Sequence, residues 1–199
     1  MRTDYFATPV YKFDIVYDND KLENWIRGIN KNVSKNIHGG FQSFEKETME
    51  YQLPYNFADL ESMLQEKINI VANDLDIGDC RLQNYWGNVN PQGSCNDTHN
   101  HPNALLVANY YVSAPGSDMG DLIVHRDDEA QYYVSQIARR NNITERQINI
   151  TPYTGLFVVF PGWVKHSVNT NLNSKDRISI SLNYGRIKNE NWPRHETRF

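Results

Sequence analysis

The second half of the sequence alternates short apolar runs with clusters of Pro, Gly and Asn, and this pattern constrains the fold more than any other feature. Such runs, separated by turn residues, are typical of the strands of a sandwich or barrel. From Asp79 onward the runs follow one another: Arg81–Asn90, Ala104–Ser113, Asp121–Val124, Gln147–Thr151, Gly155–Phe160 and Arg177–Tyr184. A helix expected at about Glu129–Asn141 interrupts the series. We therefore predict a mainly β, mostly antiparallel body.

The first half of the chain predicts a strand and a helix that support this body. Phe6–Ile15 fits a strand at a sheet edge, because Pro9 lacks the N–H that a central strand would donate. The first helix is expected to be capped by Asn19 or Asp20. Its apolar side chains recur at helical spacing: Leu22, Trp25, Ile26 and Ile29.

A second helix is expected from about Phe57 to Leu75. Its apolar positions form one stripe: Leu60, Met63, Leu64, Ile68 and Val71. Because each helix has a single apolar face, we expect both to pack against a sheet. The polar segment Lys35–Asn56, which contains Gly39 and Gly40, is expected to be a loop with room for one strand.

The length and organisation of the chain predict one domain. The sequence has 199 residues, and it shows no internal repeat, low-complexity tract or linker. Residues 1–78 would supply the N-terminal strand and the supporting helices. Residues 79–187 would form the β core, and residues 188–199 a C-terminal tail. None of these patterns specifies an oligomeric state.

Charge and composition exclude several functional classes. The net charge is -4 and no block of Lys and Arg is present, which argues against a nucleic-acid partner. No apolar run approaches the roughly 18 residues of a membrane span, and the N-terminus lacks the apolar run of a signal peptide. Cys80 and Cys95 are too few for a disulfide scaffold or a thiolate zinc cluster. We expect a cytoplasmic protein with reduced thiols and no membrane partner.

Three histidines form a pattern that suits a metal ion. His99 and His101 are two positions apart, and residues i and i+2 of an extended chain point to the same face. His166 follows the buried strand expected at Gly155–Phe160 and the turn Pro161-Gly162. Three protein ligands of this kind would leave open positions on an iron ion for a cosubstrate and oxygen. A single histidine would more often be a structural or surface residue, so the arrangement carries the hypothesis.

The last expected strand carries a polar face as well as an apolar one. Arg177, Ser179, Ser181 and Asn183 alternate with Ile178, Ile180 and Leu182. Such a face usually meets water. An Arg and a Ser two positions apart can also hold a carboxylate, through a bidentate charge-assisted contact and a hydroxyl donor. If the face points into a barrel, Arg177 and Ser179 would form an anion site beside the metal.

The order of these motifs resembles the Fe(II)/2-oxoglutarate-dependent oxygenase superfamily. The motifs are His99-x-His101, Asn109-Tyr110-Tyr111-Val112, Gly120-Asp-Leu, the run from Gly155 through Trp163 to His166, and Arg177-x-Ser179. More narrowly, the chain resembles a small oxygenase family of bacteria and tailed phages, whose members start with a strand similar to Phe6-Ala-Thr-Pro-Val10. The resemblance is dense over about Leu82–Ile187. It implies a double-stranded β-helix, or jelly-roll barrel, and in a phage-encoded protein it would place the activity in the host cytoplasm.

The resemblance also implies a role for each site residue. His99 matches the first iron ligand, and His166 matches the distal one. Arg177 matches the residue that pairs with the far carboxylate of 2-oxoglutarate, and Ser179 matches its hydroxyl helper. Tyr111 is a further expected contact, because the family often has a Tyr on that strand, and Asn109 shares the same face.

The chain departs from the superfamily at His101, where a carboxylate is usual. We favour His101 as the second ligand, and Asp97, which is also two positions from His99, stays as the alternative. His125 could line the mouth of the pocket, whereas His38 and His195 are expected to be surface residues. The helix at about Glu129–Asn141 could form a lid.

The implied function is an Fe(II)/2-oxoglutarate-dependent oxygenase that hydroxylates a substrate which the sequence does not identify. The reaction would consume 2-oxoglutarate and O2 and release succinate and carbon dioxide. Two alternatives stay open. The first is a cupin-like metal enzyme that uses no 2-oxoglutarate, and the second is a non-catalytic metal-binding jelly-roll module.

Overall fold

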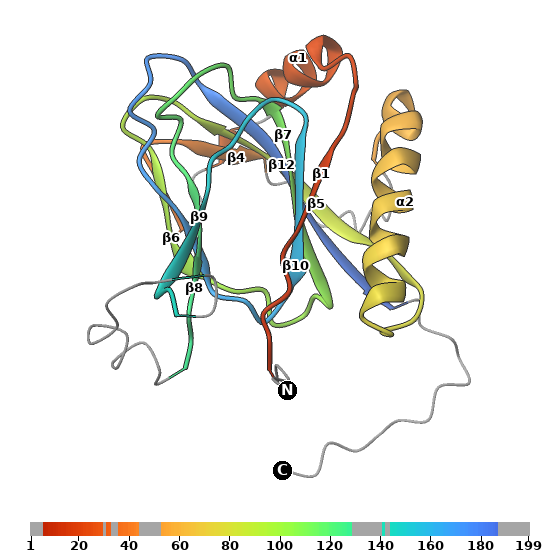
Figure 1. Cartoon of the computed structure of the whole chain (residues 1–199). Helices are drawn as coiled ribbons and strands as arrows, with labels where there is room; N and C mark the ends of the chain where they lie inside the picture. The colour runs from red at the N-terminus through yellow and green to blue at the C-terminus, as the bar shows by residue number, and fades with distance from the viewer. Residues whose placement is uncertain are drawn as a thin grey trace.

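Two facing β-sheets form the body of the molecule, and two helices pack outside the larger sheet (Figure 1). The computed structural model describes residues 6–29, 31–32, 36–43, 53–128, 141 and 144–186. The expected helix at Glu129–Asn141, apart from residue 141 itself, and the expected tail at 188–199 lie outside these residues. Within them, no helix is long and apolar enough to cross a membrane.

The larger sheet is antiparallel throughout and has its two longest strands near its centre. Its order is β1 (Tyr11–Asp14), β10 (Leu156–Pro161), β7 (Leu106–Ser113), β12 (Arg177–Arg186), β5 (Cys80–Asn90), β4 (Phe41–Ser43) and β2 (Lys31–Asn32). The smaller sheet has the order β3 (Ile37–His38), β6 (Cys95–His99), β11 (His166–Val168), β8 (Leu122–His125) and β9 (Gln147–Ile150).

The chain passes repeatedly between the two sheets. Going from β5 to β12, successive strands lie in the larger, smaller, larger, smaller, smaller, larger, smaller and larger sheet. Strands that are neighbours in space are therefore distant in sequence. This alternation is the winding of a double-stranded β-helix, so the predicted jelly-roll fold is confirmed.

All the strands predicted after Asp79 are present, with boundaries that differ by a few residues. Two strands of the smaller sheet, β6 and β11, were not predicted. The expectation of at most one strand in Lys35–Asn56 is wrong, because both β3 and β4 lie there. Phe6–Ile15 is shorter than expected, since only Tyr11–Asp14 pairs as a strand, and it does lie at a sheet edge as predicted.

The two helices predicted in the first half of the chain are present. Helix α1 spans Asp20–Gly28, and α2 spans Ala58–Asp74 after a short 3-10 turn, η1 (Tyr55–Phe57). Of the two predicted caps, Asn19 or Asp20, the structure has Asn19 at the N-cap position, but the side-chain capping bond expected there is not made. The Asn19 Oδ1 accepts a hydrogen bond from the Tyr110 hydroxyl instead.

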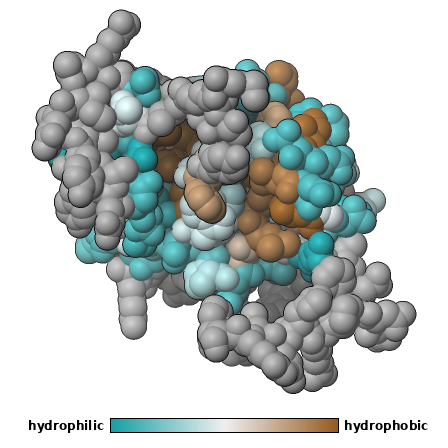
Figure 2. Space-filling model, turned by 60° about the horizontal axis from the view of Figure 1, so that its bottom comes forward, coloured by the Kyte–Doolittle hydropathy of each residue, from teal (hydrophilic) through white to brown (hydrophobic). Residues whose placement is uncertain are grey.

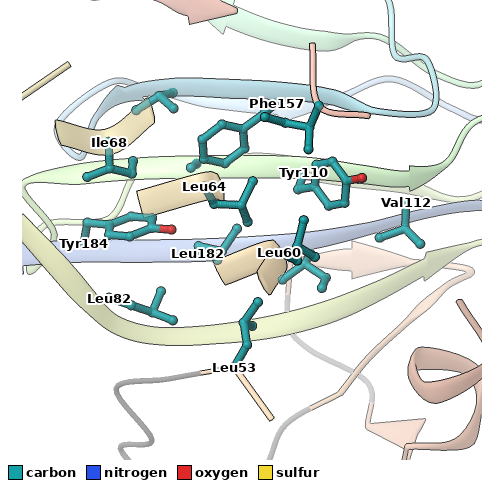
Figure 3. Close-up of a cluster of buried hydrophobic side chains, with 14 of the residues drawn as sticks. Leu53, Leu60, Leu64, Ile68, Leu82, Tyr110, Val112, Phe157, Leu182 and Tyr184 are labelled. Carbon is teal, nitrogen blue, oxygen red and sulfur yellow. The ribbon is translucent and has the colours of Figure 1, made fainter. Parts of the chain in front are cut away.

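The outer face of the larger sheet and the two helices enclose the main hydrophobic core. Leu60, Leu64 and Ile68 of α2 are fully buried against it. They face residues of four strands: Leu82 of β5, Tyr110 and Val112 of β7, Phe157 of β10, and Leu182 and Tyr184 of β12 (Figure 3). Burying this face of the sheet leaves the opposite face of the same strands to line the barrel interior.

A second apolar cluster fills part of the space between the two sheets. It combines Val107 and Tyr111 of β7, alternate residues of β10, and Leu122 and Val124 of β8. Every residue of β10 is buried, as predicted for a strand covered on both faces. Buried polar side chains lie beside this cluster, among them His166, Arg177 and Ser179.

Candidate metal centre

His99 and His166 are brought together by strand pairing in the smaller sheet. His99 is the last residue of β6, His166 is the first of β11, and the two are direct partners in the antiparallel ladder. Their ring centroids are 4.4 Å apart. Phe160 of β10 packs its edge against His166. The pairing of two short strands thus places two imidazoles side by side at one end of the barrel.

His101 joins this pair from a turn rather than from the strand. β6 ends at His99, and the His101 backbone N–H donates to the Gly162 carbonyl at 2.9 Å. A Cβ on Gly162 would lie 2.1 Å from the Ala104 oxygen and 2.8 Å from the His101 oxygen. Only glycine therefore allows the Pro161-Gly162 turn to approach the His101 segment so closely.

One potential ligand atom from each of His99, His101 and His166 lies within 4.8 Å of the other two. Each ring also has an oxygen partner at Nδ1: the Asp97 carbonyl at 2.7 Å, Asn183 Oδ1 at 2.6 Å and the Val164 carbonyl at 3.0 Å. An oxygen that accepts from Nδ1–H fixes the neutral tautomer whose Nε2 carries a lone pair. The three Nε2 atoms are thereby left as ligands.

Burial keeps the imidazoles of His101 and His166 in the form that binds metals. His166 is only 3% exposed, and burial together with the neighbouring His99 lowers its pKa from 6.5 to about 3. Burial also lowers the pKa of His101. A neutral imidazole is the form that coordinates a metal ion.

The Asp97 carboxylate points away from the three histidines. Its Oδ2 contacts His38 Nε2 at 2.7 Å, and both side chains are more than half exposed. Among the described residues, the cluster of possible metal ligands contains His101 and not Asp97. The geometry favours His101 over Asp97 as the second ligand, and it accounts for His38 as a surface residue with an acidic partner.

His125 lies behind the three histidines. Its neighbour Val124 faces the barrel interior, so His125 projects from the other side of β8. Its Nε2 contacts Ser167 Oγ at 2.8 Å. The structure therefore gives no support to the expectation that His125 lines the mouth of the pocket, and His195 lies outside the described residues.

Arg177 is buried at the start of β12, on the face that lines the barrel. Its side chain is 2% exposed, and its Nη1 donates to the Met119 carbonyl at 2.8 Å and the Gly120 carbonyl at 2.7 Å. Gly120 has a φ of +82°, and a Cβ there would lie 2.7 Å from Arg177 Nη1. The described residues place no carboxylate in a salt bridge with Arg177, so a buried cation faces the interior without an acidic partner.

Tyr111 and Trp86 each bury a donor that lacks a protein acceptor. The Tyr111 hydroxyl and the Trp86 Nε1–H are shielded from water and make no hydrogen bond within the described residues. Burial raises the pKa of Tyr111 to about 12, so the hydroxyl keeps its proton. Buried donors normally find partners. A ligand that offers oxygen acceptors, such as a dicarboxylate, fits this interior.

Ser179 and Asn109 belong to a buried polar network on the same face. The Asn88 amide nitrogen lies 3.4 Å from Ser179 Oγ and 3.0 Å from Ser181 Oγ, and Ser181 Oγ donates to Asn109 Oδ1 at 2.8 Å. No sequence motif indicates a role for Asn88, although it lies two positions from Trp86 on β5 and therefore shares its face. The face of the molecule toward the lower end of Figure 1 shows apolar side chains among polar ones (Figure 2).

Comparison with known proteins agrees with this geometry. The family model described as "Putative 2OG-Fe(II) oxygenase" matches residues 84–183, which is half of the chain and includes every candidate site residue. That family depends on Fe(II) and 2-oxoglutarate. No curated protein matches the sequence.

Several solved structures share the fold at low sequence identity. A prolyl-4-hydroxylase from Pseudomonas putida has a TM-score of 0.62 and 14% identity, over 89% of this chain and 92% of that one. HygX from Streptomyces hygroscopicus, with nickel and 2-oxoglutarate bound, has a TM-score of 0.59 and 11% identity, over 91% and 84%. The α-ketoglutarate-dependent epimerase SnoN from nogalamycin biosynthesis has a TM-score of 0.60 and 13% identity, over 88% and 77%. These likenesses show the shared fold, and the family match over half of the chain shows that the chain belongs to the Fe(II)- and 2-oxoglutarate-dependent oxygenases.

Proposed function

We propose that the protein holds ferrous iron on His99, His101 and His166 and hydroxylates a substrate at the expense of 2-oxoglutarate and O2. The observation that carries this proposal is one barrel interior with three convergent imidazoles and a buried Arg177 that has no acidic partner among the described residues. Iron with 2-oxoglutarate, when bound, supplies the oxidising chemistry that consumes O2 and yields succinate and carbon dioxide.

The chain's own residues would bind and orient the reactants. Arg177 is held by two backbone carbonyls through Nη1, which leaves its other donors for the far carboxylate of 2-oxoglutarate. Tyr111 carries a protonated hydroxyl that can donate to the same ligand. Ser179 and Asn109 belong to the adjoining polar network and would line this part of the site. No side chain is required as a general acid or base.

The cytoplasm is the location that we propose, because ferrous iron and reduced thiols are both maintained there. Cys80 and Cys95 are free in the structure.

Succinate formation tests the proposal. Purified protein loaded with Fe(II) without oxygen should convert 2-oxoglutarate to succinate slowly when O2 is admitted, even without the primary substrate. Arg177→Met should lower this turnover at least 100-fold and still bind Ni(II). Arg186→Met, on the exposed end of the same strand, is the matched control and should behave as wild type.

The two alternatives give other results. A cupin-like enzyme uses no 2-oxoglutarate, so a wild-type protein that binds metal but forms no succinate from 2-oxoglutarate would favour it. A protein that takes up no metal would exclude both enzymatic functions. Since a fold neighbour is an epimerase, hydroxylation itself needs a second measurement. Incorporation of ¹⁸O from ¹⁸O2 into the product of a candidate substrate would establish it.

A further inference from the structure

Among the described residues, Asn183 is the one side chain that hydrogen-bonds to Nδ1 of a candidate metal ligand. His99 and His166 both use backbone carbonyls as Nδ1 partners, whereas His101 uses the side-chain oxygen of Asn183 at 2.6 Å. Asn183 is fixed in turn, because its Nδ2 donates to Asn84 Oδ1 at 2.8 Å. Asn84 of β5 and Asn183 of β12 therefore form a pair of hydrogen-bonded side-chain amides, and the second amide contacts His101.

A local irregularity of the larger sheet places this pair of amides. Asn183 pairs with Asn84, but the next residue, Tyr184, pairs with Leu82, so β5 has one extra residue at this point. Tyr184 and Leu82 belong to the outer core. Because of this bulge, Tyr184 and Leu82 pack into the core outside the sheet, while Asn183 and Asn84 lie on the inner face. Bulges commonly redirect side chains beside active sites.

The His101 ring has a second constraint. It is stacked on Trp86 of β5, with centroids 5.6 Å apart and ring planes 24° apart. Trp86 restricts the plane of the imidazole, and Asn183 restricts its rotation within that plane. His101 lies in a turn and has no strand to hold it, so these two contacts replace the support that β6 and β11 give to the other two histidines.

We infer that Asn183 is a positioning residue for His101, and that the Asn84–Asn183 pair makes a neutral imidazole the second ligand of this centre. The inference rests on the proposed metal site. It explains how the chain accommodates a histidine where its superfamily usually has a carboxylate. Asn183 Oδ1 accepts a hydrogen bond from an imidazole N–H, and it would repel a carboxylate oxygen at the same place.

The consequence for charge is specific. All three Nδ1 partners are neutral oxygens, and the nearby Asp97 carboxylate is directed to His38. A divalent ion held here keeps its formal +2 charge, one unit more than at a site with two histidines and a carboxylate. Such a centre favours anionic ligands in its open positions.

Metal affinity separates this role from a merely structural one. Asn183→Leu keeps the approximate volume but removes the acceptor, and it should weaken Ni(II) binding about 10- to 100-fold in calorimetry of the apoprotein. Asn183→Asp restores an acceptor and should bind Ni(II) at least as tightly as wild type. Asn149→Leu, on the exposed strand β9, is the control and should stay within about twofold.

The Co(II)-loaded protein supplies a second measurement. Its proton NMR spectrum in H2O should show three exchangeable imidazole N–H signals shifted by the metal. Asn183→Leu should lose one of them through faster exchange with water, and Asn183→Asp should keep all three. If Asn183→Leu does not fold, Asn84→Ala tests the same pair of amides by removing the partner of Asn183. It should weaken Ni(II) binding severalfold.

Failure of the positioning role and failure of the proposed metal site give different results. Normal Ni(II) affinity and three protected N–H signals in Asn183→Leu would overturn the positioning role and leave the proposed function intact. A wild-type protein that binds neither Ni(II) nor Co(II) would overturn the metal site and the inference together.

Discussion

His99 and His166 face each other across the β6–β11 ladder with ring centroids 4.4 Å apart, and each ring is oriented through Nδ1 by a backbone carbonyl of its own segment. The strand pairing and these two carbonyls therefore set how close the two candidate ligands lie. Burial and the neighbouring His99 make protonation of the His166 ring unfavourable and lower its pKa.

This arrangement predicts that the metal-free protein loses stability in acid. The pKa of His166 is lowered to about 3 by burial and the adjacent histidines, so the unfolded chain binds the proton first as the pH falls below 6.5. The stabilising contribution is complete above pH 6.5 and is lost toward about pH 3. The slope for one such group is about 1.4 kcal/mol per pH unit.

Urea denaturation of the apoprotein between pH 7 and pH 5 measures this slope. His166→Gln retains a buried polar side chain but cannot titrate, and its free energy of unfolding should depend less on pH. Parallel curves for wild type and His166→Gln would refute the prediction.

Gly162→Ala should damage the His101 ligand specifically. The new Cβ would overlap the Ala104 and His101 carbonyl oxygens, so the turn must move. We expect a loss of about 1–3 kcal/mol in the free energy of unfolding, together with weaker Ni(II) binding. Gly28→Ala is the control because its Cβ meets nothing within 4 Å, and it should be neutral or slightly stabilising. Unchanged Ni(II) affinity in a Gly162→Ala protein would contradict the close approach.

Two adjacent tyrosines should respond in opposite ways to loss of the hydroxyl. Tyr111 buries a hydroxyl that has no hydrogen-bond partner among the described residues. Tyr111→Phe should therefore leave the ligand-free protein as stable as wild type or more so, while weakening 2-oxoglutarate binding about tenfold. The Tyr110 hydroxyl bonds Asn19 on the outer face. Tyr110→Phe should cost about 1 kcal/mol in stability and leave 2-oxoglutarate affinity unchanged. Thermal unfolding and calorimetric titration of both variants check the prediction, and equal 2-oxoglutarate affinities would refute it.

The outer core should dominate stability without affecting the site. Leu64 of α2 is fully buried among strands β5, β7, β10 and β12 (Figure 3). Leu64→Ala should lower the free energy of unfolding by about 2–5 kcal/mol. Ile70→Ala, on the exposed side of the same helix, should change it by less than about 1 kcal/mol. Denaturant titration compares them, and Ni(II) affinity should be normal in both folded proteins.

The strands that could be predicted are those whose sequences record burial. β10 is apolar throughout because both faces are covered, and β12 alternates because one face meets the outer core and the other the polar interior. β6 has the sequence Cys-Asn-Asp-Thr-His and β11 has only three residues. These two strands exist because they pair with each other and with their neighbours, and such pairing leaves no apolar pattern.

The candidate ligands were predictable for a similar reason, and their support was not. Histidine spacing and motif order indicated His99, His101 and His166 before any geometry was known. Asn183 was seen only as one more polar residue of its strand. Its partner His101 is 82 residues away in the sequence, and the contact depends on a bulge in the opposite strand. No local pattern encodes such a contact.

The position of β12 has a consequence for biosynthesis. β12 follows every other described strand in the chain, yet it lies inside the larger sheet and pairs with β5 on one side and β7 on the other. A nascent chain emerges from the ribosome at about 5–20 residues per second. The place between β5 and β7 must therefore stay open until β12 is released. Arg177 and Asn183 arrive with that strand. The protein therefore completes the proposed anion site and the support of His101 in the same late step that closes the sheet.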